Sequence, residues 1–206
     1  IEVANDRFGN QEILSMVLQS DIEKIRTTLD EVDKTAFQGA VDSILAAKNI
    51  YILGVRSSAA IATFLSFYFN LMFDNVKHIH TSSNAEMFEQ MIRIDKDDVV
   101  IGISFPRYST RTVEAMRFAR SCGAQVISIT DGPMSPLHEV SDVCLNACTD
   151  MASFVDSLAA PMSVINALVV SLGLHRKEEL SRHFKQLEAI WAANDVYLGE
   201  TDEQKT

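Results

Sequence analysis

Five short apolar segments alternate with segments of helical periodicity, and this alternation constrains the fold more than any other feature of the sequence. The expected strands are Ile50–Leu53, Val76–His80, Val99–Ile103, Gln125–Thr130 and Val143–Asn146. Helical spacing of apolar residues predicts helices over residues 57–73, 84–92, 109–122, 152–174 and 176–194, with a short one near 135–140. Alternation of this kind predicts an α/β fold, a three-layer α/β/α sandwich around a five-stranded parallel sheet.

Two further helices are expected before the first strand. Apolar residues at helical spacing predict one over about 10–31, and Asp33 is a plausible N-cap for the next. Neither belongs to the alternating unit, so they could pack on the sheet or on a partner subunit. The expected organisation is a linker remnant at 1–9, a single domain with flanking helices at 10–198, and a polar tail at 199–206.

Composition and charge exclude several classes of protein. The chain has 206 residues, 47% of them hydrophobic, and a formal net charge of −10, which disfavours direct binding of nucleic acid. No apolar stretch approaches the roughly 20 residues of a membrane span, and no signal peptide is visible. The three cysteines form no metal-binding or disulfide pattern, so we expect reduced thiols and a cytoplasmic protein without metal or cofactor.

The loop after the third expected strand carries the strongest functional signal. Ser104, Ser109, Thr110 and Thr112 supply four hydroxyls where a helix begins, more than helix capping requires. Helix N-termini bind anions through unpaired N–H groups and the positive end of the helix dipole. We therefore predict a phosphate site here. Arg107 is either a phosphate-binding fork or a solvated or interface arginine.

Two other strand-end loops are candidates for the same site. Gly54 permits a tight exit from the first strand, and Ser57 and Ser58 follow where a helix begins; helix capping and ligand contact explain these serines equally well. Ser83, after the second strand, has the same two explanations. The sequence has neither a dinucleotide-binding fingerprint nor a P-loop.

No residue stands out as a catalytic group. Glu86, Glu114 and Asp156 are the acidic residues that strand topology brings nearest to the cleft. Each is more typical of a solvated or capping position than of a general base, and we assign no catalytic residue.

Residues 45–175 resemble the SIS (sugar isomerase) domain, in the form found in RpiR-type transcriptional regulators. SIS domains have Gly-x-Gly-x-Ser after the first strand, here Gly54-Val-Arg-Ser-Ser58, and Ser-x-Ser-Gly-x-Thr after the third, here Ser104-Phe-Pro-Arg-Tyr-Ser109. A Thr-rich strand end with Ser-Pro-Leu (129–137) and a Ser-Asp pair (141–142) also recur. The chain departs from the motifs at Arg56, which replaces a glycine, and at Pro106 and Arg107, which replace Ser-Gly.

The resemblance implies a flavodoxin-like fold that binds a phosphorylated sugar or related metabolite through Ser58, Ser104 and Ser109. It also implies a homo-oligomer, dimer or tetramer, that touches DNA only through an N-terminal helix-turn-helix domain. Because the chain begins at Ile1, we expect a fragment without that domain. The predicted function is therefore a phosphosugar-sensing domain of a transcriptional regulator. An aldose–ketose isomerase and a structural module with a degenerate pocket are the alternatives.

Overall fold

A computed structural model describes residues 10–149 and 155–197 of the chain. The expected linker at 1–9 and the expected tail at 199–206 both lie outside the described residues. Two helices, α2 (Asn10–Glu31) and α3 (Lys34–Ala46), precede the sheet, and Asp33 caps α3 by accepting hydrogen bonds from the backbone N–H groups of Thr35 and Ala36. Both helices and this cap agree with the expectation from sequence.

The centre of the fold is a parallel sheet with the strand order β2-β1-β3-β4-β5. Its strands are β1 (Ile50–Gly54), β2 (Val76–Ile79), β3 (Val99–Ile103), β4 (Gln125–Thr130) and β5 (Val143–Asn146). The predicted α/β architecture is confirmed, and each strand boundary agrees with its expectation to within one residue. From β1 the chain first adds β2 on one side and then β3 on the other, so a topological switch point lies between β1 and β3.

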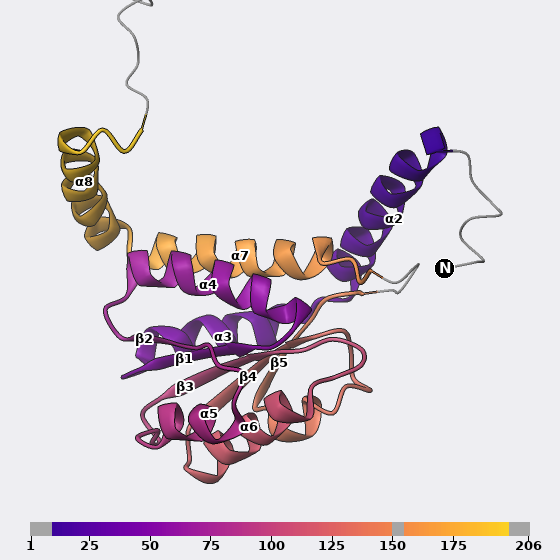
Figure 1. The fold of residues 1–206 in the computed structure, drawn as a ribbon, viewed down its shortest axis with the longest axis horizontal. Helices are drawn as coiled ribbons and strands as arrows, with labels where there is room; N and C mark the ends of the chain where they lie inside the picture. The colour runs from indigo at the N-terminus through magenta and orange to yellow at the C-terminus, as the bar shows by residue number, and fades with distance from the viewer. Residues whose placement is uncertain (1–9, 150–154, 198–206) are drawn as a thin grey trace, which may run out of the picture.

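Helices cover both faces of the sheet (Figure 1). Helices α3, α4 (Ser57–Met72) and α7 (Ala159–His175) bury one face against residues such as Ile52 and Ile101. Helices α5 (Asn84–Met91), α6 (Thr110–Ser121) and the short 3-10 helix η1 (His138–Val140) cover the other face. The expected helix over 152–174 is wrong at its start. Residues 150–154 lie outside the described part, and Val155–Leu158 are not helical, so the helix begins at Ala159.

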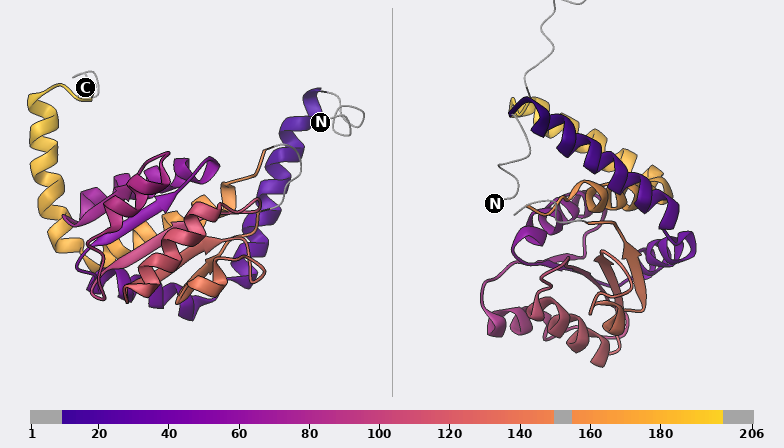
Figure 2. Two further views of the ribbon diagram at one scale, coloured as in Figure 1. Left: turned by 60° about the horizontal axis from the view of Figure 1, so that its bottom comes forward. Right: turned by 90° about the vertical axis from the view of Figure 1, so that its right-hand side faces the viewer.

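Two helices project from the body of the domain. Helix α2 and helix α8 (Lys177–Ala193) rise on the same side of the molecule, at opposite ends of α7 (Figures 1 and 2). Exposed large apolar side chains are concentrated on this side: Ile13, Leu14, Met16, Val17, Leu18, Ile22, Ile25 and Leu29 of α2, Phe67 of α4, Val170 and Leu174 of α7, and Ile190 of α8.

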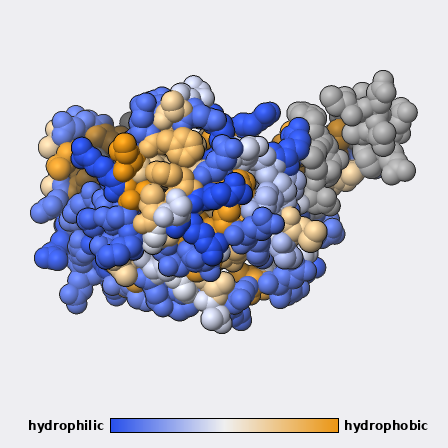
Figure 3. All heavy atoms as spheres, turned by 90° about the horizontal axis from the view of Figure 1, so that it is seen from below, coloured by the Kyte–Doolittle hydropathy of each residue, from blue (hydrophilic) through white to orange (hydrophobic). Residues whose placement is uncertain are grey.

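The opposite side of the molecule is different. Between residues 76 and 149 the exposed large apolar side chains are Ile92 and Met134 alone. The face viewed in Figure 3 is accordingly covered mostly by hydrophilic side chains around smaller apolar patches. Among the described residues, no helix is both long and apolar enough to cross a membrane.

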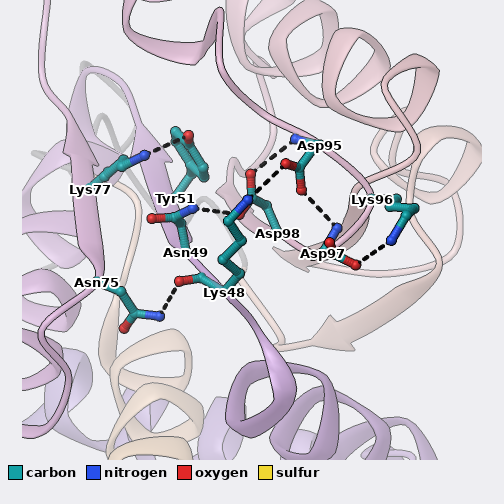
Figure 4. A network of polar contacts seen from close by, with 9 residues as sticks. All are labelled: Lys48, Asn49, Tyr51, Asn75, Lys77, Asp95, Lys96, Asp97 and Asp98. Atoms are coloured by element: carbon teal, nitrogen blue, oxygen red, sulfur yellow. Dashed lines mark hydrogen bonds and ion pairs between the residues drawn. The ribbon is translucent and has the colours of Figure 1, made fainter.

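A closed polar network joins the amino ends of the strands (Figure 4). The Asp98 carboxylate, 1% exposed, accepts hydrogen bonds from Asn49 Nδ2 at 2.7 Å and from the Asp95 backbone N–H at 3.0 Å. Lys48 Nζ lies 3.0 Å from the Asp95 carboxylate, and Asn75 Nδ2 donates to the Lys48 carbonyl at 2.6 Å. The network therefore ties together the segments that enter β1, β2 and β3.

Candidate functional site

A cavity of about 110 Å³ lies at the switch point, where β1 and β3 end. Ligands bind at the carboxyl ends of the strands at such points in open α/β sheets. Two loops supply most of the walls, because the chains leaving β1 and β3 turn to opposite faces of the sheet. The lining residues are Val55, Arg56, Ser57, Ser58, Ser104, Phe105, Pro106, Arg107, Ser109 and Asp156.

Hydroxyl groups and an uncapped helix N-terminus make the cavity rich in hydrogen-bond donors. Ser57 and Ser58 are the first two residues of α4, and the N-cap residue, Arg56, makes no side-chain hydrogen bond to this helix end. The N-termini of α3, α5 and α6, by contrast, are each capped by a side chain. The Ala59 backbone N–H donates to the Arg56 carbonyl at 3.0 Å, and the backbone N–H groups of Ser57 and Ser58 remain available to an anion.

The loop after β3 is rigidly supported from within and from β4. Ser104 Oγ accepts a hydrogen bond from the Ser109 backbone N–H at 3.1 Å, and Ser109 Oγ caps α6 by accepting from Thr112 N at 3.4 Å. Thr130 Oγ1 donates to the Ser104 carbonyl at 2.8 Å. The loop is therefore held in shape before any ligand arrives, which lowers the entropic cost of binding.

Tyr108 ties the same loop to the end of β4. Its hydroxyl lies 2.9 and 3.0 Å from the two carboxylate oxygens of Asp131. Burial, together with the hydrogen bond to the Asp131 carboxylate and the negative charge of that group, raises the pKa of Tyr108 to about 12. No local pattern in the sequence indicates this pair, because the two residues are separated by 23 positions and meet only when β3 and β4 lie side by side.

Two arginines in the cavity wall occupy strained backbone positions. Arg56 has φ 57° and ψ −127°, and Arg107 has φ 64°; the other described non-glycine residue with positive φ is Asp195, after α8. Positive φ favours glycine, and the SIS motifs have glycine at both arginine positions. The chain thus keeps a glycine-type backbone in both loops while placing a cationic side chain on each, and strain of this kind clusters at functional sites.

One carboxylate also lines the cavity. Asp156 lies before α7, and its Oδ2 is 3.9 Å from Arg107 Nη2. The Asp156 side chain is 15% exposed, whereas that of Arg107 is 67% exposed. Of the three acidic residues that topology suggested, Asp156 alone lines the cavity; Glu86 is instead hydrogen-bonded to Thr81 and Gln90 on the β2–α5 side.

The structure brings together five of the nine residues predicted to bind ligand. Ser57, Ser58, Ser104, Arg107 and Ser109 line the cavity, and Gly54, Ser83, Thr110 and Thr112 do not. Gly54 has a packing role, because a Cβ there would lie 2.7 Å from the Ser58 carbonyl oxygen. Ser83 Oγ caps α5 by accepting a hydrogen bond from Glu86 N at 3.4 Å.

The other two residues belong to the first turn of α6. Thr110 begins this helix and is exposed, and Thr112 is fully buried. In the described part of the chain, no three His, Cys, Asp or Glu residues are grouped so that they could hold a metal ion.

Comparison with known proteins gives two kinds of relative. An uncharacterized HTH-type transcriptional regulator of Caldanaerobacter subterraneus is 21% identical over 188 residues, which are 89% of this chain and 66% of the regulator. A glutamine–fructose-6-phosphate aminotransferase (isomerizing) of Pyrobaculum aerophilum is 29% identical over 124 residues, 60% of this chain and 20% of the enzyme. The chain thus spans about two thirds of the first relative and one fifth of the second.

Solved structures share the fold. The sugar isomerase domain of an RpiR transcription factor from Sphaerobacter thermophilus superposes with a TM-score of 0.82 at 24% identity, over 86% of this chain and 99% of that one. NanR of Vibrio vulnificus, complexed with ManNAc-6P, gives a TM-score of 0.75 at 16% identity, over 93% of this chain and 72% of that one. The family model of the SIS domain matches residues 43–171, more than half of the chain, so this protein belongs to the SIS domain family.

Proposed function

We propose that this domain binds a phosphorylated sugar or a closely related phosphorylated metabolite and acts as the sensor of a transcriptional regulator. The observation that carries the proposal is the cavity at the switch point, where four serine hydroxyls, two arginines and the uncapped N-terminus of α4 converge. A phosphate group requires donors and positive charge of this kind. The similarity to regulators and the ManNAc-6P held by NanR support the same class of ligand.

A short connection from the cavity to α2 supports a sensing role. Asp156 lines the cavity, and the next residue, Ser157, donates a hydrogen bond from Oγ to Asp21 Oδ1 of α2 at 2.5 Å. The Cys148 backbone N–H also bonds to Thr28 Oγ1 of α2, at 2.8 Å. A ligand that moves Asp156 would therefore shift the contact between the domain and its first helix. Such a ligand regulates only if it prefers one arrangement over the other.

The apolar side of the molecule supports self-association. Helix α2 turns polar residues toward its own domain, since Lys24 and Thr28 are 6% and 7% exposed, while Leu18 and Leu29 on its other face are 54% and 68% exposed. Exposed apolar surface of this kind marks an interaction site. We propose that two copies associate through α2, α7 and α8, as a dimer or as half of a tetramer. DNA contact belongs to a helix-turn-helix segment outside these residues, in a cytoplasmic regulator.

The alternative function, an aldose–ketose isomerase, needs a base within reach of a carbon-bound proton. Asp156 favours this alternative, because it is the one carboxylate in the described wall of the cavity.

The test is a thermal-shift screen with inorganic phosphate and a panel of sugar monophosphates, followed by turnover assays on every binder. For a sensor we expect stabilisation of about 2.7 kcal/mol at 100 times the dissociation constant, without turnover. Turnover of a binder would establish the isomerase instead. Absence of any stabilisation across the panel would contradict both and leave the structural module.

A further inference from the structure

The carboxylate of Asp156 is the least expected group in a cavity built for an anion. The other polar side chains of the wall are serines and arginines, yet this carboxylate is only 15% exposed and shares the wall with Ser58, Ser104 and Arg107. In the described structure it accepts no hydrogen bond, and its one charged neighbour, Arg107 Nη2, stands at 3.9 Å. Asp156 therefore presents unused acceptor capacity toward whatever occupies the cavity.

The size of the cavity places the rest of the ligand near this carboxylate. At about 110 Å³ it is well below the roughly 300–1,000 Å³ of pockets that enclose a whole drug-sized ligand. A cavity of this size would enclose a phosphate head group and leave the attached carbon chain at its mouth. Because Asp156 and the exposed Arg107 belong to the same small wall, the first atoms beyond the phosphate would lie close to them.

The cavity wall has too little positive charge to neutralise a second anionic group on the ligand. Arg56 and Arg107 contribute two positive charges, and Asp156 contributes one negative charge. A bound phosphate monoester carries about −1.5 to −2 at pH 7, which exceeds the surplus. A further carboxylate or phosphate on the ligand would meet Asp156 without a compensating cation, in a chain whose net charge is already −10.

We infer that Asp156 is a specificity-determining residue, which selects ligands with one phosphate and a hydroxyl- or ammonium-bearing body and rejects ligands with a second anionic group. The inference rests on the proposed function, since it assigns the ligand class of the same site. Hydroxyl and ammonium groups donate to the free carboxylate oxygens, whereas a sugar acid phosphate places like charges side by side.

A matched pair of ligands tests the inference directly. Glucitol 6-phosphate and 6-phosphogluconate differ only at C1, which is a primary alcohol in the first and a carboxylate in the second. We expect the wild-type chain to bind glucitol 6-phosphate about tenfold more tightly in calorimetric titrations at low salt, as one screened like-charge contact requires. Equal affinities, or a preference for 6-phosphogluconate, would overturn the inference and leave the proposed function standing.

The variant Asp156→Asn tests whether the preference between the two ligands depends on this residue. It keeps the shape of the side chain and removes its charge, so 6-phosphogluconate should gain affinity relative to glucitol 6-phosphate and the preference should fall to within about twofold. Asp74→Asn is the matched control: Asp74 is exposed, precedes β2 at the far end of the sheet, and its loss changes the net charge equally. A preference that survives in Asp156→Asn, or falls equally in Asp74→Asn, overturns the inference.

Failure of the proposed function gives a different result. If neither ligand binds the wild-type chain and the sugar-phosphate panel also gives no shift, the site itself is wrong and the inference falls with it. The wild-type preference is measured without any substitution, so the inference can fail even if Asp156→Asn does not fold.

Discussion

The two ends of the sheet differ in how completely their polar groups are hydrogen-bonded. At the amino ends, Asp98 and its neighbours form a closed set of hydrogen bonds, in which the buried carboxylate finds donors from two segments (Figure 4). At the carboxyl ends, α4 lacks a side-chain cap, Asp156 accepts no hydrogen bond among the described residues, and both arginines of the cavity wall have positive φ.

The difference shows that the amino ends of the strands contribute to stability, whereas the carboxyl ends have free groups that can bind a ligand. Satisfied polar groups stabilise a structure, whereas free donors and strained residues lower its stability and remain ready for a ligand. Changes at the amino end should therefore alter stability alone. Changes at the carboxyl end should separate stability from affinity, and in one case move them in opposite directions.

The largest effect should follow Asp98→Ala, which removes the centre of the closed network. The Asn49 amide and the Asp95 backbone N–H would lose their buried acceptor, and we expect the free energy of unfolding to fall by about 3 kcal/mol. Urea denaturation measures the loss. Asp97→Ala is the control, since this exposed residue makes its side-chain pair with Lys96 in solvent and should cost under about 1 kcal/mol. A change in ligand affinity in a folded Asp98→Ala protein would contradict the claim that changes at the amino ends of the strands alter stability alone.

The next effect concerns the serines of the cavity. In Ser104→Ala/Ser109→Ala we expect affinity for the best sugar phosphate of the panel to fall at least about 30-fold, or 2 kcal/mol, because two donors to the phosphate are lost. The fold should remain, at a cost of about 1 kcal/mol for the α6 cap.

The matched control for that variant is Ser83→Ala. Ser83 caps α5 as Ser109 caps α6, yet it does not line the cavity. Its substitution should cost similar stability and leave affinity unchanged. Unchanged affinity in the double variant would remove the proposed site.

A smaller effect with an unusual sign is expected for Arg56→Gly. Glycine adopts φ 57° without the clash of a Cβ, so we expect the free energy of unfolding to rise by about 1 kcal/mol while affinity for the sugar phosphate falls. Arg117→Gly, on the exposed side of α6, should lose about 1 kcal/mol because glycine is a poor helix former. Destabilisation by Arg56→Gly would contradict the claim that strain is held at the site.

The smallest effect is expected for Tyr108→Phe, about 1 kcal/mol or less for the lost hydrogen bonds to Asp131. The folded pKa of Tyr108, about 12, lies above the ordinary value of 10.0. Its stabilising contribution is therefore full below pH 10 and is lost as the pH rises toward 12. Denaturation between pH 9 and 12 should show a steeper decline in wild type than in Tyr108→Phe.

The control for the pH dependence is Tyr68→Phe. The Tyr68 hydroxyl makes no hydrogen bond to the described residues, so this variant should decline as wild type does. Parallel curves for wild type and Tyr108→Phe would show that the pair does not hold the loop.

The helices and strands were largely predictable because hydrophobic periodicity is a local signal. Strand β3 has the predicted bounds, Val99–Ile103, and Asp33 caps α3 as expected. The start of α7 was missed because the apolar residues Phe154, Val155 and Leu158 continue a helical spacing. The structure instead uses Ser157 to bond Asp21 of α2, a contact across 136 residues that no local pattern contains.

The candidate site was predictable in its chemistry and less so in its membership. Hydroxyls after β1 and β3 indicated an anion site, and five of the proposed residues do line one cavity. Thr110 and Thr112 follow the same hydroxyl pattern, but helix geometry turns Thr112 into the interior, where it is fully buried. Arg107 was named as a possible phosphate-binding residue, whereas Arg56 was visible only as a departure from the SIS motif. The positive φ of both arginines could not be predicted from the sequence.

What the sequence determined by itself is the order of strands and helices, the family, and a hydroxyl-rich loop at the start of two helices. All three depend on hydrophobic periodicity and on short motifs, which are formed by residues close together in the sequence. Only the tertiary structure decided which loops share a cavity and that Asp156 enters it. It also decided that α2 buries Lys24 and Thr28 while exposing its leucines. Those features arise where segments distant in the chain are brought together by the spatial order of the strands in the sheet. That spatial order differs from the order along the chain, and no local pattern encodes it.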